Sequence, residues 1–326
     1  MKQELILSFL VISALSLCWY YAIITEEENK IELEFLDFIS KYNKNYNTVE
    51  EYEYRLEVFK ENLIKISNLN FKNPKASFKM NKFGDYDKSD LSQLLSLLPM
   101  TTEIAFDTSQ SSQSDLTLMS PISWSNYFPN ASHQGDCNAS WAFTAASCYD
   151  LFYALSQNQT KITKTYSTQQ LVDWIDQKYS CKGGNAFQAV FDMQMRQSDW
   201  CTSEEYQYEE KKYDWRQIEK CKSNKNSEFL IKMMFDELEL LINLKHGAVV
   251  VDVNADEWVF YHEGIIEDCG EGDLNHSALV VGTDARNWVE LRNSWGVQWG
   301  ELGNIRLSIN PMQNMCKYAT RGLQMV

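Results

Sequence analysis

Basic segments are missing from this sequence, and with them the features of a protein that binds nucleic acid. Lysine and arginine number 30 against 45 aspartates and glutamates, which gives a formal net charge of -15, and no Lys/Arg run or basic stripe occurs. Such an acidic chain is repelled by phosphate-rich surfaces. We therefore exclude nucleic acid and anionic lipid surfaces as partners.

Metal-binding patterns are missing as well. No two cysteines stand at C-x2-C spacing, and the 4 histidines do not cluster with any of the 8 cysteines. Structural zinc sites are built from such closely spaced thiols and imidazoles. The sequence therefore predicts neither a metal nor another cofactor.

The N-terminus carries a targeting segment. Lys2 precedes an apolar run from Leu5 to Ile24, which is typical of a secretory signal peptide. The run is also about 20 residues long, enough to cross a bilayer as an uncleaved signal anchor, and only that form would contact a membrane. Either interpretation of residues 1–24 directs the chain into the secretory pathway, to a lysosome or vacuole or to the exterior.

The cysteines suit that destination, because paired thiols are expected in an oxidising compartment. Cys18 lies in the targeting segment, which leaves seven. Seven is odd, so one cysteine remains unpaired or pairs outside the chain.

Three regions of different texture follow. Residues 31–70 show two helical apolar stripes with a join near Tyr46 to Thr48. Residues 101–118 are rich in Ser, Thr, Gln and Asp and predict an exposed linker where the chain is processed. Beyond them, a helix at 140–157 is apolar nearly all round and therefore buried. Short β-branched runs predict strands at 247–253, 277–282, 288–292 and 304–308.

Three blocks of the last region carry a resemblance. Residues 134–143 read Gln-Gly-Asp-Cys-Asn-Ala-Ser-Trp-Ala-Phe, residues 275–278 read Asn-His-Ser-Ala, and residues 293–296 read Asn-Ser-Trp-Gly. In order and spacing these blocks resemble the Cys, His and Asn signatures of the papain-like cysteine proteases. Ser140, however, stands where that family has its nucleophilic cysteine.

The N-terminal region resembles the helical propeptide of the cathepsin L-like members of that family. Its spaced pattern E-x3-R-x3-F-x2-N-x3-I-x3-N is matched by six residues: Glu51, Arg55, Phe59, Asn62, Ile66 and Asn70. A companion motif is matched by Asn81, Phe83 and Asp85, with Lys79 in place of its usual glycine.

The resemblance implies an α+β fold with two lobes, one helical and one an antiparallel, barrel-like sheet, behind an N-terminal helical propeptide. We expect residues 25–100 to form an inhibitory propeptide, 101–118 the maturation region and 119–326 a monomeric peptidase domain. The implied partners are a peptide or protein in the cleft between the lobes and the chain's own propeptide.

Carried over residue by residue, the resemblance assigns His276 as base and acid, Asn293 as its orienter and Trp295 as the indole that shields them. Gln134 would donate a hydrogen bond to the oxyanion. Ser140 breaks this scheme, because a hydroxyl does not ionise beside an imidazolium as a thiol does. The combination predicts a fold that keeps its cleft but has lost most or all peptide hydrolysis.

Two other functions stay open at this point. A Ser140 and His276 pair could hydrolyse an easier bond, and Ala139-Ser140 also resembles the silicateins, cathepsin-like proteins with serine at the nucleophile position. The chain could also be a secreted structural or interaction protein that reuses the fold.

Cys181-Lys-Gly183-Gly184 resembles the family's segment that binds substrate backbone. The resemblance implies disulfides between Cys137 and Cys181 and between Cys269 and Cys316. A third family bridge would join Cys221 to the position of Trp174 and cannot form, so Cys148 or Cys201 could replace the lost partner.

Four N-x-Ser/Thr sequons occur, at Asn130, Asn138, Asn158 and Asn275. Asn158 is the best acceptor, because it follows a predicted helix. Asn138 and Asn275 flank the predicted site, and a glycan on either would block it.

Overall fold

A computed structural model describes most of the chain. The described residues are 26, 28–100, 120–175, 180–196, 200–213, 228–310 and 313–326. The predicted targeting segment, the predicted linker at 101–118 and Cys221 lie outside them. Within the described residues, no helix is both long and apolar enough to cross a membrane.

The chain divides into two compact units, of which the first comprises residues up to 65 together with 80–87. Its helices are residues 28–42 and the N-terminal part of α2 (Val49–Lys72). The join lies where the sequence predicts it. The Thr48 hydroxyl accepts a hydrogen bond from Glu51 N–H, and the Glu51 carboxylate accepts one from Asn47 N–H, so this pair caps the start of α2.

Aromatic packing and polar contacts along α2 hold the first unit together. Phe35, Phe38 and Phe59 are buried against one another and form its core. Arg55 donates to Asp85 O, and Asn62 donates to Gly84 O and Tyr86 O. Residues of the spaced α2 pattern therefore fix the companion motif through its backbone carbonyls.

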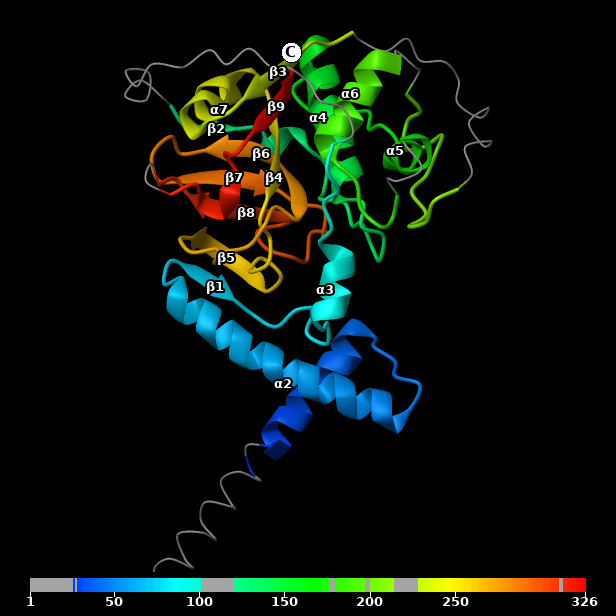
Figure 1. Cartoon of the computed structure of the whole chain (residues 1–326), viewed down its shortest axis with the longest axis vertical. Helices are drawn as coiled ribbons and strands as arrows, with labels where there is room; N and C mark the ends of the chain where they lie inside the picture. The colour runs from blue at the N-terminus through cyan, green and yellow to red at the C-terminus, as the bar shows by residue number, and fades with distance from the viewer. Residues whose placement is uncertain are drawn as a thin grey trace, which may run out of the picture. The chain divides into compact units, whose positions relative to one another are not determined.

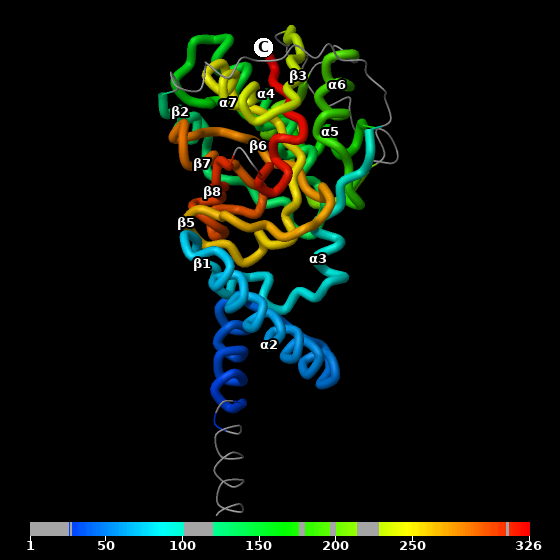
Figure 2. Tube along the Cα trace, turned by 60° about the vertical axis from the view of Figure 1, so that its left-hand side comes forward, coloured from blue at the N-terminus to red at the C-terminus, as the bar shows by residue number. Residues whose placement is uncertain are grey.

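The second unit comprises residues 66–79 and 88–326. Its helices are α3 (Lys88–Leu94), α4 (Ser140–Ser156), α5 (Thr168–Trp174), α6 (Ala186–Arg196) and α7 (Glu237–Asn243). Figure 1 shows α4, α5 and α6 on one side and the strands on the other, and Figure 2 again shows α5 and α6 apart from β5, β7 and β8. This arrangement is the α+β, two-lobed architecture that the sequence predicts.

Nine strands of the described residues form the sheet side. They are β1 (Ala76–Phe78), β2 (Ile122–Ser123), β3 (Ile231–Met234), β4 (Val249–Val253), β5 (Tyr261–Ile266), β6 (His276–Thr283), β7 (Trp288–Arg292), β8 (Asn304–Ser308) and β9 (Gly322–Met325). Their order is β1-β5-β8-β7-β6-β4-β9-β3, with β2 beside β6. The pairs are antiparallel except β5 with β8, which is parallel and departs from the expected pattern.

The central strand β6 explains where the core lies. Every residue of β6 is buried, because β4 and β7 pair with its two edges and α4 packs against it. Most of α4 is buried too, as its all-round apolar sequence predicts. The first residues of these two elements are Ser140 and His276, so the core contact positions both.

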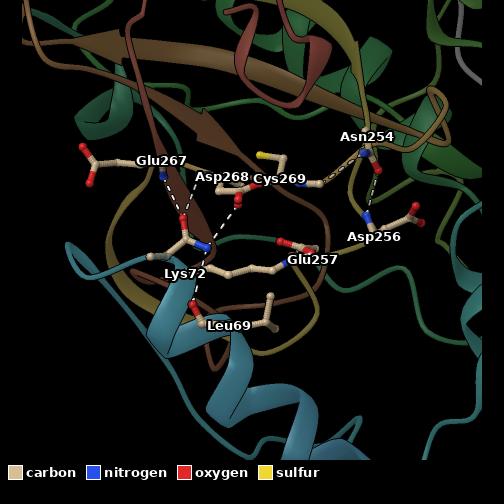
Figure 3. Close-up of polar contacts among 10 residues, drawn as sticks. Leu69, Lys72, Asn254, Asp256, Glu257, Glu267, Asp268 and Cys269 are labelled. Carbon is tan, nitrogen blue, oxygen red and sulfur yellow. Dashed lines mark hydrogen bonds and ion pairs between the residues drawn. The ribbon is translucent and has the colours of Figure 1, made fainter.

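The end of α2 is attached to the sheet by Asn73, a fully buried residue. Its carboxamide oxygen accepts hydrogen bonds from Glu267 N–H (2.9 Å) and Asp268 N–H (2.8 Å). Its amide nitrogen donates to Asp268 O and Leu69 O, and Lys72 nearby pairs with Glu257 (Figure 3). The adjoining β1 then pairs with β5, and Lys79 N–H donates to Phe260 O without the positive φ that would demand glycine.

Candidate active site

Ser140 begins α4 and is 2% exposed. The preceding residue, Ala139, has no side chain that could cap the helix. The loop before it is tied down by the Cys137–Cys181 disulfide and by Asn138 N–H, which donates to Cys181 O. A rigid loop therefore presents the Ser140 hydroxyl at the positive end of the α4 dipole.

His276 is oriented by Asn293. The ring atom Nε2 lies 2.8 Å from Asn293 Oδ1, which also accepts a hydrogen bond from Ser294 N–H. Because Oδ1 accepts, the neutral imidazole carries its proton on Nε2 and leaves a lone pair on Nδ1. Within the described part of the chain, Nδ1 has no hydrogen-bond partner.

Two indoles enclose this imidazole. The Trp295 ring lies 5.1 Å from the His276 ring, and the Trp258 ring lies 6.2 Å away, edge on. His276 and both indoles are fully buried. Burial disfavours the imidazolium and lowers the pKa of His276 to about 4, a shift that the hydrogen bond to Asn293 only partly opposes.

Gln134 is buried between the loop that precedes α4 and the loop that follows β7. Its amide nitrogen donates to Cys137 O (3.2 Å), and its amide oxygen accepts from the Ser294 hydroxyl (2.7 Å). Its backbone N–H donates to Ser294 O. These contacts fix a side-chain N–H donor close to the start of α4.

Gly183 and Gly184 lie beside a segment of the chain itself. Leu98 N–H donates to Gly184 O (2.9 Å), and the Ser96 hydroxyl donates to Lys182 O. A Cβ on Gly183, whose φ is +120°, would lie 2.6 Å from Ser96 O. We call residues 182–185 the Gly184 edge; its glycines allow an extended backbone to approach closely.

The cysteines divide into bonded and free. Cys137 is bonded to Cys181, Cys269 to Cys316, and Cys201 is also in a disulfide. Cys148 is free and buried, and burial raises the pKa of its thiol to about 12. It lines a separate cavity of about 400 Å³ together with Leu155 and Gln324, so it supplies no thiolate to His276.

Three residues of this region have roles that the sequence does not indicate. Asn185 caps α6 by accepting from Gln188 N–H and also donates to Leu98 O, and its only signal is its place after the double glycine. Trp258 packs against His276 but lies in no sequence motif that would indicate this contact. Ser294, inside a recognised block, holds Gln134.

The two sequons that flank the site have asparagines that are buried or hydrogen-bonded to another side chain. Asn138 is 1% exposed, and Asn275 donates to the Asp256 carboxylate at 2.6 Å. Asn158 is exposed. No group of three or more metal-ligating side chains lies together among the described residues.

The fold and the imidazole–carboxamide pair define a peptidase scaffold of the cysteine type. The family model described as "Papain family cysteine protease" matches residues 122–325, and that of the cathepsin propeptide inhibitor domain matches residues 35–91. The chain therefore belongs to the papain family and is a cathepsin L-like homologue with a propeptide domain.

Individual relatives agree. A viral cathepsin of Choristoneura fumiferana nuclear polyhedrosis virus is 30% identical over 295 residues, covering 85% of this chain and 86% of its own. Putative cathepsin L 3 of Paramecium tetraurelia is 30% identical over 324 residues, covering 97% of each chain. The structure of digestive procathepsin L 3 of Tenebrio molitor larval midgut matches with a TM-score of 0.74 at 26% identity, over 91% of this chain and 99% of that one.

Proposed function

We propose that this papain-family homologue binds an extended peptide along the Gly184 edge and has lost most or all peptide-bond hydrolysis. Ser140 carries the proposal: it begins α4 at the position where the family's signature has its nucleophilic cysteine. The protein would then act by binding peptides or proteins without cleaving them.

The chemistry of the three side chains supports the loss of hydrolysis. Cysteine peptidases work because a thiol ionises beside an imidazolium, and a serine hydroxyl does not. Serine peptidases instead stabilise the imidazolium with a buried aspartate. Here the residue that orients His276 is the uncharged Asn293, and burial already disfavours the imidazolium.

The chain's own backbone supports the peptide-binding role. Residues 96–98 lie along the Gly184 edge with Leu97 in a parallel bridge to Gly184. This pairing uses only backbone donors and acceptors. Because these groups are the same in every peptide, a groove that pairs with backbone can bind peptides of many sequences. A peptide ligand would replace this segment after processing within the linker.

Localisation to the secretory pathway, and from there to a lysosome, a vacuole or the exterior, is part of the same proposal. The Cys137–Cys181 and Cys269–Cys316 disulfides favour an oxidising compartment. The propeptide domain, shared with the procathepsins, favours synthesis as a proenzyme.

Peptide binding is tested on protein cleaved within the predicted linker and separated from its propeptide. We expect labelled random-sequence peptides to bind the cleaved protein and not the intact chain, as measured by fluorescence anisotropy, because residues 96–98 block the edge in the intact chain. The Gly183→Val variant is the matched control, since a branched side chain at this position obstructs the approaching backbone. Equal binding by the variant would contradict the assignment of the Gly184 edge.

A further inference from the structure

An ion pair with a buried carboxylate lies on the strand pair that carries His276. Asp252 pairs with Ser277 in the β4–β6 register, and its carboxylate accepts a hydrogen bond from the Ser277 hydroxyl. The other carboxylate oxygen lies 2.8 Å from Arg321 Nη2. The Asp252 side chain is 0% exposed, whereas that of Arg321 is 29% exposed. The cation therefore forms the accessible end of this pair.

The Arg321 guanidinium touches both sides of the second unit. On the helical side it lies 4.5 Å from the ring centroid of Phe187, in the first turn of α6 directly after the Gly184 edge. On the sheet side it is held by Asp252 of β4. Arg321 thus lies between α6, which begins directly after the Gly184 edge, and the strand pair that carries His276.

The donors of this guanidinium are incompletely used. A guanidinium carries five N–H bonds and accepts none. Asp252 is a strong acceptor for Nη2, but Nη1 faces the thioether sulfur of Met100 at 3.5 Å, which is a weak acceptor. The buried Nε atom has no partner within the residues that the structure describes. The Arg321 guanidinium can therefore donate charge-assisted hydrogen bonds to a second carboxylate.

The position of Met100 shows which part of a peptide would reach Arg321. Met100 belongs to the same segment whose Leu98 is hydrogen-bonded to Gly184, and it follows that residue by two positions. An extended occupant of the Gly184 edge therefore places a side chain against the guanidinium, as this segment does. In the intact chain that side chain is a thioether, which leaves the charge of Arg321 without a second anion.

We propose that Arg321 selects peptides with an acidic side chain, Glu or Asp, at the position equivalent to Met100. The proposal rests on the proposed function, because it names the class of ligand that the Gly184 edge prefers. The alternative is an ion pair that only stabilises the fold and is indifferent to the neighbouring side chain.

The intact chain provides the test, because Met100 can be converted into the ligand side chain. Glutamate and glutamine have nearly the length of methionine, so Met100→Glu and Met100→Gln differ only in charge at the position of the sulfur. We expect Met100→Glu to unfold about 2–4 °C higher than Met100→Gln, and Met100→Lys to unfold below both. Equal melting temperatures for the three variants would overturn the proposal.

A second background isolates the role of Arg321. In the Asp252→Asn/Arg321→Gln chain, which lacks both charges, we expect the advantage of Glu over Gln at position 100 to disappear. The same advantage in both backgrounds would assign the effect to another cation and overturn the proposal. If the double variant does not fold, the order Glu, Gln, Lys in the parent background still decides the question.

Peptide binding separates failure of this proposal from failure of the proposed function. We expect the cleaved protein to bind a peptide with Glu at the position equivalent to Met100 about tenfold more tightly than the same peptide with Gln at that position. Equal affinities would overturn the selection by Arg321 and leave peptide binding intact. If neither peptide binds, the proposed function fails, whereas the melting temperatures still report on Arg321.

Discussion

His276 Nε2 and Asn293 Oδ1 lie 2.8 Å apart, and this contact fixes which nitrogen of the imidazole carries the proton. The lone pair on Nδ1 is left for a proton from the nucleophile. The same geometry serves a thiolate well and a hydroxyl poorly, because a carboxamide cannot stabilise the imidazolium as a carboxylate does.

The depressed pKa of His276 makes the fold sensitive to acid. In the folded protein the pKa is lowered to about 4, whereas an unfolded histidine titrates near its ordinary value of 6.5. The unfolded chain therefore binds more protons between these values, and stability rises with pH across this window and is fully present above it. We expect this group to contribute about 3 kcal/mol between pH 4 and 7.

Urea unfolding of the parent and of His276→Gln at pH 4.5 and 7 checks this contribution. The variant should lose that part of the pH dependence, because its amide does not titrate. A variant with an unchanged pH dependence would show that other groups cause it.

Replacing Ser140 by cysteine should change the titration of His276. A thiolate at the start of α4 stabilises the imidazolium, so the pKa of His276 should rise in Ser140→Cys. Observing the ring nitrogens of His276 by NMR across pH 3 to 9 measures both forms. Identical titration of the two proteins would mean that the residue-140 side chain does not face the imidazole.

Asn138 and Asn185 form a matched pair of buried asparagines. Neither carboxamide atom of Asn138 has a hydrogen-bond partner in the described part of the protein, whereas Asn185 caps α6 and donates to Leu98 O. A buried unsatisfied polar group costs about 1–3 kcal/mol. We expect Asn138→Ala to stabilise the fold by about 1 kcal/mol and Asn185→Ala to destabilise it by about 2 kcal/mol. Thermal unfolding compares them, and similar losses in both would refute the distinction.

Asn73 and Lys72 test the attachment of α2 to the sheet. Removing the Asn73 carboxamide leaves the partly buried N–H groups of Glu267 and Asp268 without their acceptor, at a cost of about 2 kcal/mol. Lys72→Ala removes an ion pair whose lysine is 47% exposed and should cost less than about 1 kcal/mol. Hydrogen exchange at Glu267 and Asp268 should increase in Asn73→Ala only; an equal increase in both variants would contradict this account.

The sequence predicted the elements whose periodicity is strong. The α4 helix and strands β4, β6, β7 and β8 lie within a few residues of their predicted ranges, because apolar or β-branched runs define them. Strand β5 is not predicted from the sequence, because His262, Glu263 and Gly264 interrupt its apolar pattern. The 7-residue helices α5 and α7 are too short for a helical period to be recognised.

The site could be predicted only where a motif is local. The recognised blocks contain His276, Asn293 and Gln134, and the resemblance supplied the pairing of the two disulfides. The contacts of Asn73 with Asp268 and of Arg321 with Asp252 join segments far apart in the chain, and no local pattern indicates them. Part of the burial around His276 comes from Trp258, which only the folded chain brings there, whereas Trp295 lies in a recognised motif.

The most direct measurement compares peptide hydrolysis by cleaved parent, Ser140→Ala and Ser140→Cys proteins on one unblocked substrate. We predict that the parent is indistinguishable from Ser140→Ala and that Ser140→Cys exceeds it by on the order of 10³-fold or more in kcat/KM. A parent that turns over within tenfold of Ser140→Cys, with that activity lost in Ser140→Ala, would establish a working serine nucleophile and contradict the account.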